Sequence, residues 1–377
     1  MGIERGKISQ RQTVLLVANT ILASMVLYIP ALLAEIAGQD AWISVLLAGV
    51  AGVVFGLLVV LLGMRHPNKD LVEYSIDLLG PWAGRTVGIL FGLFFLYLNG
   101  AVVRQFSELL VNLVMPETPL IVFIGVIVAL AAYGVYLGLE VFARVNELLF
   151  PLAFFIVMVF LMASVPEMRL SNLKPAFVHP CSALLRSSAI LFSFYTEGSA
   201  LLMFYPSLRR PEKGKGISYQ VGIFLLILMM ADVLGVIALF GPEETARMAF
   251  PTFELAKMVR LGGFIERIES LFIGVWVAMG GLKVMVLYYV SALAFAESWG
   301  LRDYRPIVLP LGMILASLAV LEFADLTQIH LLFRLLHVFI IAVPVAITLL
   351  LWLFTIIRGR ERKSGGEQKE KKAENSA

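Results

Sequence analysis

The chain has 377 residues, of which 60% are hydrophobic and 15% are charged. An average soluble domain is about half apolar and about a quarter charged, so this composition excludes an ordinary soluble globular protein. The formal net charge of +3 gives no support to nucleic-acid binding, and the single cysteine, Cys181, cannot form a disulfide within the chain.

The apolar residues are gathered into long uncharged runs. These runs include Ile43–Met64 with 22 residues, Leu120–Leu139 with 20, Leu148–Val165 with 18 and Val338–Ile357 with 20. Because a helix rises about 1.5 Å per residue, about 20 apolar residues cross a hydrocarbon core of about 30 Å. The sequence therefore predicts an all-α integral membrane protein that lies in a lipid bilayer. The first apolar run continues to Ala34 without a cleavage site, so we expect the first helix to be retained.

In chain order, the runs predict about ten transmembrane helices, at residues 12–36, 42–64, 83–113, 119–139, 146–165, 184–207, 217–241, 266–297, 306–322 and 333–357. Residues 1–357 are expected to form a single transmembrane domain. The tail at 358–377 is polar and of mixed charge, so it is predicted to be disordered. Three longer connections, 66–82, 166–183 and 242–265, have room for a surface helix or a partial lid.

The positions of Lys and Arg predict the orientation in the membrane. With a cytoplasmic N-terminus, twenty of these residues lie on the cytoplasmic side, seven of them between Arg358 and Lys372, and eight lie on the opposite side. Cytoplasmic segments of membrane proteins are enriched in Lys and Arg. Since the number of spans is even, both termini are expected in the cytoplasm.

The first and sixth spans look interrupted. In the first, the small residues Ala23 and Ser24 precede Pro30, although a proline kink with close helix packing would explain them as well. In the sixth, Pro206 follows a polar cluster in mid-membrane that consists of Tyr195, Thr196, Glu197, Gly198 and Ser199. Backbone groups in hydrocarbon must be bonded, so a broken helix is tolerated only where it lines protein or water.

Spans 1 and 6 occupy matching positions in two halves of five helices each, at 12–165 and 184–357. Two halves with an odd number of spans have opposite topology in the membrane. Interrupted helices at matching positions predict an inverted-repeat transporter fold, with a ligand site between the two interruptions.

Several polar residues are predicted to lie inside the membrane. An ionisable residue at the centre of a membrane helix costs about 2.5–3.5 kcal/mol, so Glu197 should face a cavity or a partner. Lys283, in the eighth span, is either a fixed internal cation at a coupling site or a snorkelling or ion-paired structural residue. Asp232 could pair with Lys283 or with backbone, and a structural role is favoured. Tyr97 and Tyr288 are candidates to line a pore.

The chain lacks the signatures of soluble enzymes. Its four histidines do not have metal-ligand spacing, and there is no phosphate-binding loop, dinucleotide fingerprint or nucleophile elbow. We therefore expect no enzyme activity, no cofactor and no metal.

Short motifs at the span boundaries carry a resemblance that covers nearly the whole chain. They are Ile29-Pro30 with Asp40-Ala41-Trp42-Ile43-Ser44; Pro67, Lys69 and Glu73-Tyr74 with Leu79-Gly80; Pro116-Glu117-Thr118-Pro119; Gly138-Leu139-Glu140 with Ala143-Arg144-Val145-Asn146-Glu147; Leu173-Lys174-Pro175; Pro251-Thr252 with Glu254-Leu255-Ala256; and Glu266-Arg267-Ile268-Glu269 with Trp276. In this order they resemble the B subunits of spore germination receptors, a family of the amino acid–polyamine–organocation superfamily.

The resemblance implies a LeuT-like 5+5 inverted repeat with broken helices 1 and 6, in the inner membrane of a spore-forming bacterium. It also implies a small neutral amino acid such as L-alanine as germinant, and an A subunit and a lipoprotein C subunit as partners. The ligand would lie between the two breaks, flanked by spans 3 and 8, and the candidate ligand-binding residues are Ala23, Ser24, Met25, Val26, Val102, Tyr195, Thr196 and Tyr288. Ala23-Ser24 stands where superfamily transporters usually have a glycine-rich break.

Two functions remain open from the residues. The first is a germinant-sensing receptor subunit, and the alternative is a proton- or sodium-coupled amino-acid transporter, because both need the same pocket. A third possibility is that the chain is itself a nutrient-gated ion or water channel, in which Tyr97 lines the path.

Overall fold

The computed structural model of the chain describes residues 6–258, 268–321 and 337–374. In this part of the chain the regular structure is helical, with one isolated bridge between Ile8 and Leu208. The main helices are α1 (Gln10–Ala37), α2 (Ala41–Arg65), α3 (Leu71–Leu79), α4 (Pro81–Leu113), α5 (Leu120–Leu137), α6 (Leu139–Ser164), α7 (Cys181–Tyr195), α8 (Leu201–Phe204), α9 (Gly214–Phe240), α10 (Pro242–Arg247), α11 (Pro251–Met258), α12 (Ile268–Trp299), α13 (Arg305–Leu321) and α15 (His337–Glu374). Short 3₁₀ segments include η1 (Gly38–Asp40), η3 (Leu170–Leu173) and η4 (Thr196–Ala200).

The chain is a multi-pass membrane protein. By length and composition, seven segments of the described chain can cross a membrane, and the first of them, Gln10–Arg65, contains both α1 and α2. α13 is a shorter apolar helix, and the sixth predicted span is divided between α7 and α8. These elements correspond to the ten predicted spans, and residues 259–267 and 322–336, at the predicted edges of spans 8 to 10, lie outside the described residues.

Helices five spans apart pack against each other. α1 packs on α7, α2 on α9, α4 on α12 and α5 on α13. These are spans 1 and 6, 2 and 7, 3 and 8, and 4 and 9, as expected when two five-helix halves enclose a common centre. The inverted-repeat architecture predicted from the two interruptions is confirmed, while the repeat limits at 165 and 184 stay a prediction.

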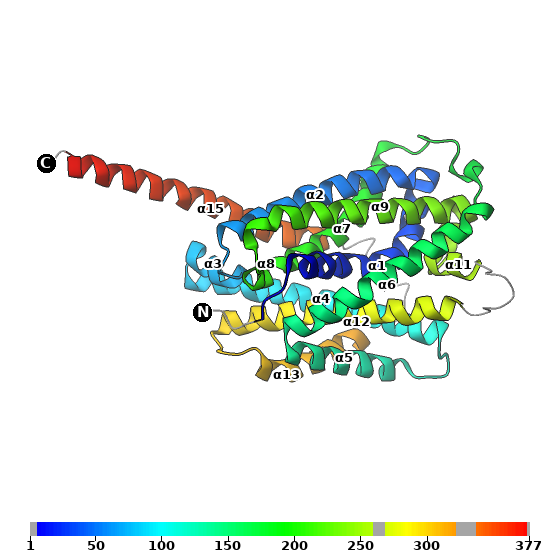
Figure 1. Cartoon of the computed structure of the whole chain (residues 1–377), viewed down its shortest axis with the longest axis horizontal. Coiled ribbons are helices and arrows are strands. Elements are labelled where there is room, and N and C mark those ends of the chain that lie inside the picture. Colours follow the sequence, from blue (N-terminus) through cyan, green and yellow to red (C-terminus); the bar gives the residue numbers. More distant parts are fainter. Residues whose placement is uncertain (1–5, 259–267, 322–336, 375–377) are drawn as a thin grey trace.

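Two short helices mark opposite ends of the bundle (Figure 1). α3 follows span 2 at one end, called here the α3 end, and α11 follows span 7 at the other, called the α11 end. α3 starts at a capping box, in which the Asp70 side chain accepts from Glu73 N at 2.9 Å and Glu73 accepts in turn from Asp70 N at 3.2 Å. Two of the three longer connections therefore contain the surface helices for which their length left room.

The predicted break in span 1 is wrong. α1 is one continuous helix from Gln10 to Ala37, with Pro30 inside it. Proline has no N–H, so the carbonyl of Val26 loses its usual helical donor. Thr252 on α11 replaces that donor, because its hydroxyl oxygen lies 2.8 Å from the Val26 oxygen. A neighbouring side chain thus satisfies the backbone, and the helix continues through the proline.

The predicted break in span 6 is confirmed. α7 ends at Tyr195, the chain continues as the 3₁₀ segment η4, and α8 adds one short turn to Phe204. The 3₁₀ segment contains Glu197, Gly198 and Ser199, and the glycine weakens the α-helix at this point. The departure from α-helical geometry is therefore confined to one of the two spans.

α15 differs from the sequence-based expectation at its C-terminal end. The helix runs to Glu374 and projects from the bundle at the α3 end, through the tail predicted to be disordered (Figure 1). The tail is rich in Lys, Arg and Glu, which have high helix propensity, although Gly365 and Gly366 interrupt them.

Close helix packing depends on glycine where α3 meets α4. A Cβ atom at Gly84 would lie 2.4 Å from the backbone of Ile76, which cannot rotate away as a side chain could. We expect Gly84→Ala to destabilise the protein by about 1–3 kcal/mol, as overpacking does. Thermal unfolding in detergent measures this effect. Gly125→Ala is the control, because a Cβ there meets nothing within 4 Å, and equal stability of the two variants would contradict the packing of α3 on α4.

Candidate functional site

A buried ion pair joins the interrupted span 6 to span 8. Lys283 Nζ on α12 lies 2.7 Å from Glu197 Oε2 on η4, and the two side chains are 0% and 2% exposed. The Lys283 ammonium also lies 5.9 Å from the centre of the Phe194 ring. The partner required by Glu197 is therefore Lys283, and Lys283 pairs with Glu197 rather than with Asp232.

Thr196 links the same segment to the last span. Its hydroxyl lies 2.6 Å from the carbonyl oxygen of Ser193 and 3.3 Å from that of Ile340 on α15. Ile340 is four residues before Pro344, so its carbonyl lacks a helical donor, as Val26 does at Pro30. η4 is thus tied to α12 by charge and to α15 by a hydroxyl.

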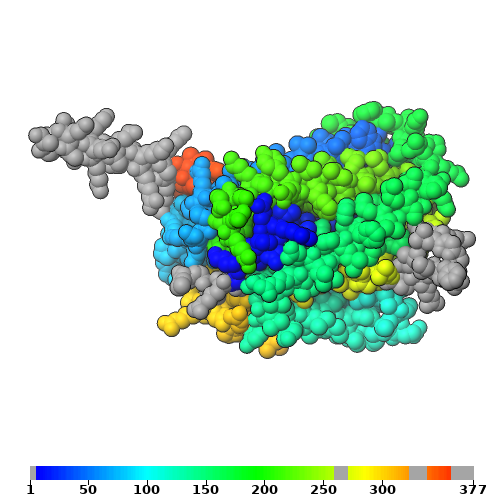
Figure 2. All heavy atoms as spheres, viewed as in Figure 1, coloured from blue at the N-terminus to red at the C-terminus, as the bar shows by residue number. Residues whose placement is uncertain are grey.

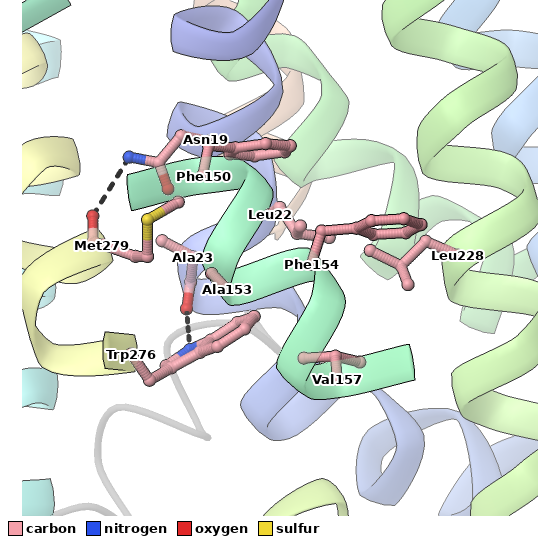
Figure 3. Close-up of a pocket in the computed structure, with 10 residues that line it drawn as sticks. All are labelled: Asn19, Leu22, Ala23, Phe150, Ala153, Phe154, Val157, Leu228, Trp276 and Met279. Atoms are coloured by element: carbon pink, nitrogen blue, oxygen red, sulfur yellow. Dashed lines mark hydrogen bonds between the residues drawn. The ribbon is translucent and has the colours of Figure 1, made fainter. Parts of the chain in front are cut away.

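One pocket lies between α1, α6, α9 and α12, and we call it the Asn19 pocket (Figure 3). It encloses about 260 Å³ of space between atoms, its open side included, and is lined by Asn19, Leu22, Ala23, Phe150, Ala153, Phe154, Val157, Leu228, Trp276 and Met279. Asn19 donates to the carbonyl of Met279 at 3.1 Å, and Trp276 Nε1 donates to the carbonyl of Ala23 at 2.8 Å. The Asn19 Oδ1 atom has no hydrogen-bond partner among the described residues.

A second pocket lies on another face of α1, and we call it the Gly198 pocket. It encloses about 380 Å³ of space between atoms, its open side included, and is lined by Val17, Ile21, Gly52, Gly56, Val59, Val60, Tyr195, Gly198, Leu201, Ile217, Ser218, Val221 and Gly222. Val17 and Ile21 of α1 face η4 across it. The Gly198 pocket thus borders the segment that carries Glu197, while the Asn19 pocket borders α12 at Met279, one turn before Lys283.

The structure distributes the predicted residues of span 1 over two faces. Ala23 lines the Asn19 pocket. Ser24 lines neither pocket, but it follows Val17 and Ile21 at helical spacing and so lies on the same face of α1, one turn beyond the Gly198 pocket. Met25 and Val26 are buried and line neither pocket.

The other predicted residues also separate. Tyr195 lines the Gly198 pocket, while Val102 is buried on α4 and lines neither pocket. Tyr288 points from α12 toward α13, where its hydroxyl donates to the carbonyl of Val308, because five residues along a helix turn it well away from Lys283. Tyr97 is half-buried on α4 and lines neither pocket. Their roles in ligand binding stay predictions.

Two polar contacts of α1 escaped the sequence analysis. Asn19 was not singled out, although an amide side chain inside an apolar run is a signal of the same kind as Glu197. Trp276 entered only as part of a motif, and its bond to the Ala23 carbonyl depends on how α12 crosses α1. No group of three or more possible metal ligands is found among the residues that the structure describes.

Asp40, in the connection between α1 and α2, fixes the α11 end. Its carboxylate accepts from the N–H groups of Phe177 and Val178, each at 2.7 Å, and from that of His179 at 3.0 Å. Burial alone would raise the pKa of Asp40, but these N–H groups and the His179 ring hold it below its usual value. These hydrogen bonds attach the loop before α7 to the end of α1.

Hydrogen bonds also hold the start of α1 at the α3 end. Ile8 N donates to the carbonyl of Ser207 at 2.9 Å, and Arg209 N donates to the carbonyl of Ile8 at 3.0 Å. Gln12 donates to Glu147 at 2.9 Å, and Arg11 pairs with the same carboxylate at 3.4 Å. Figure 2 shows the start of α1 (blue) at the surface between the segment around α8 (green) and α6. α1 is therefore held at both ends.

Comparison with known proteins places the chain in a family. The family model described as "Spore germination protein" matches residues 7–326. The chain belongs to this spore germination protein family. Spore germination protein KB of Bacillus subtilis (strain 168) is 26% identical over 390 residues, covering 98% of this chain and all of that protein. Spore germination protein YndE of the same organism is 26% identical over 294 residues, covering 77% of this chain and 81% of that protein.

Solved transporter structures share the fold of this family member. The crystal structure of MhsT in complex with L-phenylalanine matches with a TM-score of 0.69 at 14% identity, over 91% of this chain and 89% of that one. A Na⁺-coupled sialic acid symporter in a substrate-bound outward-open state matches with a TM-score of 0.67 at 12% identity, over 87% and 77%. The LeuT-like fold expected from the sequence is thus confirmed.

The ion pair predicts strong coupling between its partners. Glu197→Gln or Lys283→Met alone leaves one charge buried without its partner, which costs about 3–5 kcal/mol. The double variant removes both charges and is expected to be close to the parent protein in stability. Thermal unfolding in detergent of the four proteins measures the coupling. If the losses of stability in the two single variants simply add in the double variant, the two groups do not act on each other. Lys283→Arg keeps the charge but not the shape, so it is expected to retain only part of the stability of the parent protein.

Proposed function

We propose that the protein is the germinant-sensing membrane subunit of a spore nutrient receptor, built on an amino-acid permease fold. The observation that carries this proposal is the match to the spore germination family over residues 7–326, in a chain whose sixth span is interrupted beside a buried ion pair. An interrupted helix in the centre of such a fold is where transporters hold their ligands.

The ligand we propose is a small neutral amino acid such as L-alanine, bound between α1 and η4 at the Gly198 pocket. Three buried hydroxyls in this region, those of Ser24, Tyr195 and Ser199, have no hydrogen-bond partner among the described residues. Unpartnered buried polar atoms are rare and costly, so they indicate groups kept for a ligand. The solved complex of MhsT, which contains L-phenylalanine, supports an amino acid as the class of ligand.

Binding would act through the ion pair. A ligand in the Gly198 pocket touches the segment that carries Glu197, and this segment is tied to α12 through Lys283. A ligand with a higher affinity for one packing of η4 shifts the population toward that packing. An A subunit and a lipoprotein C subunit would bind the surface of the bundle and respond to this change in packing.

We further propose the inner membrane of a spore-forming bacterium as the location, with both termini in the cytoplasm. In this orientation the α3 end is cytoplasmic and the α11 end faces outward. The excess of Lys and Arg in segments of the α3 end supports this orientation.

A proton- or sodium-coupled amino-acid transporter is the second candidate. The structural similarity to two transporters, one of them Na⁺-coupled, favours it. Robust uptake of labelled amino acids into liposomes that contain the purified protein alone, driven by an ion gradient, would contradict a pure sensor. The Glu197–Lys283 pair has a place in either function, as a coupling element.

The sensor function is tested in spores of the source organism. Deletion of the gene is expected to remove germination by one class of nutrient and to leave germination by other nutrients intact. Spores that respond to every amino acid in a panel as the parent does would contradict the proposal. Restoring the gene, and separately restoring the Lys283→Ala variant, shows whether the internal cation is needed.

The ligand position predicts a further result. Ser24→Phe places a ring on the face of α1 at the Gly198 pocket and is expected to raise the germinant concentration for half-maximal response at least tenfold, at unchanged protein level. Leu309→Phe is the matched control, because Leu309 is 72% exposed on the outer face of α13. Unchanged sensitivity of Ser24→Phe would show that the ligand lies elsewhere.

A further inference from the structure

A carboxyl, a hydroxyl and a backbone carbonyl form a chain that joins three helices. Asp232 lies within α9 and is fully buried, and Thr252 lies in the first turn of α11. Thr252 Oγ1 is 2.9 Å from Asp232 Oδ1 and 2.8 Å from the carbonyl oxygen of Val26 on α1. Both distances are those of a hydrogen bond.

The two contacts require two protons, and Thr252 has one. A hydroxyl donates a single proton and accepts with its lone pairs. The Val26 carbonyl can only accept, and it has lost its helical donor to Pro30, so the Thr252 proton is needed there. The contact between Thr252 and Asp232 is then a hydrogen bond only if the Asp232 carboxyl is protonated and donates.

The surroundings of Asp232 also favour a neutral carboxyl. Its second oxygen, Oδ2, has no hydrogen-bond partner in the described part of the chain, which would be costly for a buried carboxylate. The central cation, Lys283, is already paired with Glu197.

The described charged side chains of α11, α10 and the neighbouring end of α1 pair with one another or are exposed. Glu254 and Lys257 on α11 pair with each other at the surface. Near the α11 end, the other charged groups of α1, of the loop before η3 and of α10 are exposed; they are Glu35, Glu167, Arg169, Glu243, Glu244 and Arg247. Asp40, the remaining buried carboxylate of this end, is held by residues 177–179. Among the described residues, no ion pair of Asp232 offsets its ionisation.

We propose that Asp232 is a proton-binding site, whose bound proton completes the chain Asp232 Oδ1–H to Thr252 Oγ1–H to the Val26 carbonyl. When the proton leaves, the carboxylate becomes the stronger acceptor, and the Thr252 hydrogen turns from Val26 to Asp232. The Val26 carbonyl is then left without a donor at the one proline of α1. The state of the proton is thereby linked to the helix that lines both pockets, and this holds whether the protein senses or transports its ligand.

Infrared difference spectroscopy of the purified full-length protein tests the proposal. At neutral pH, subtracting the spectrum of Asp232→Asn from that of the parent protein is expected to reveal the C=O stretch of one protonated carboxylic acid. Asparagine keeps the shape and can donate an N–H to Thr252, so the variant should fold. A difference spectrum that shows a lost carboxylate band, or no lost band, would overturn the proposal.

A second pair of variants tests it without changing Asp232. Thr252→Val removes the acceptor of the carboxyl proton, so the C=O stretch is expected to move to higher wavenumber. Thr252→Ser keeps the hydroxyl and is expected to leave the band near its original position. An identical carboxylic acid region in the two variants would overturn the proposal even if Asp232→Asn failed to fold.

Discussion

The fold depends on one constraint, which is that every backbone group inside the bilayer must have a hydrogen-bond partner. Prolines lie inside four described helices, and those of α1 and α15 free the carbonyls of Val26 and Ile340. In both helices a threonine of another element approaches the freed carbonyl, Thr252 at the first and Thr196 at the second. Thr252 donates to the Val26 carbonyl and so joins α11 to α1. Thr196 has a single hydroxyl proton, and its hydroxyl oxygen lies closer to the carbonyl oxygen of Ser193, at 2.6 Å, than to that of Ile340, at 3.3 Å, so its contact with α15 is the weaker of the two. The contacts of Thr252 with Val26 and of Thr196 with Ile340 therefore help to position α11 and η4 against the bundle.

The cost of burying a charge also acts on η4, through Glu197. A buried ion pair is weak evidence of stability, since its desolvation offsets much of the attraction, but removing either partner is costly. Glu197 and Lys283 therefore hold η4 in position less by adding stability than by excluding arrangements in which they separate. η4 has the properties expected of a two-state element: it departs from α-helical geometry, it borders a pocket, and its position depends on a charge on α12.

Much of this could be predicted from the sequence, and most of the failures concern contacts between segments that are distant in the chain. Length and apolarity are enough to predict the spans, and the polar cluster at 195–199 is enough to predict the break in span 6, because both are properties of one segment. The continuity of α1 could not be predicted, because it depends on Thr252, more than two hundred residues away. Tyr288 was a candidate for the centre, yet it faces α13, because the rotation of α12 is set by packing that the sequence does not show. Asn19 was missed for the opposite reason: its local signal was present and was outweighed by the proline further along the span.

α1 takes part in the contacts at both ends of the bundle and in both pockets. Its two ends are held, by Asp40 and the loop before α7 at one and by Ile8 and Glu147 at the other, so a change at the centre cannot simply move the helix as a rigid rod. Its middle carries the Ala23 carbonyl bonded to Trp276, the Val26 carbonyl bonded to Thr252, and one face of each pocket. We expect a helix held at both ends and bonded through side chains at its middle to respond by bending at Pro30, because proline removes one helical hydrogen bond there. Ligand in a pocket and proton on Asp232 would then act on the same bend, which is the condition for each to alter the affinity of the other.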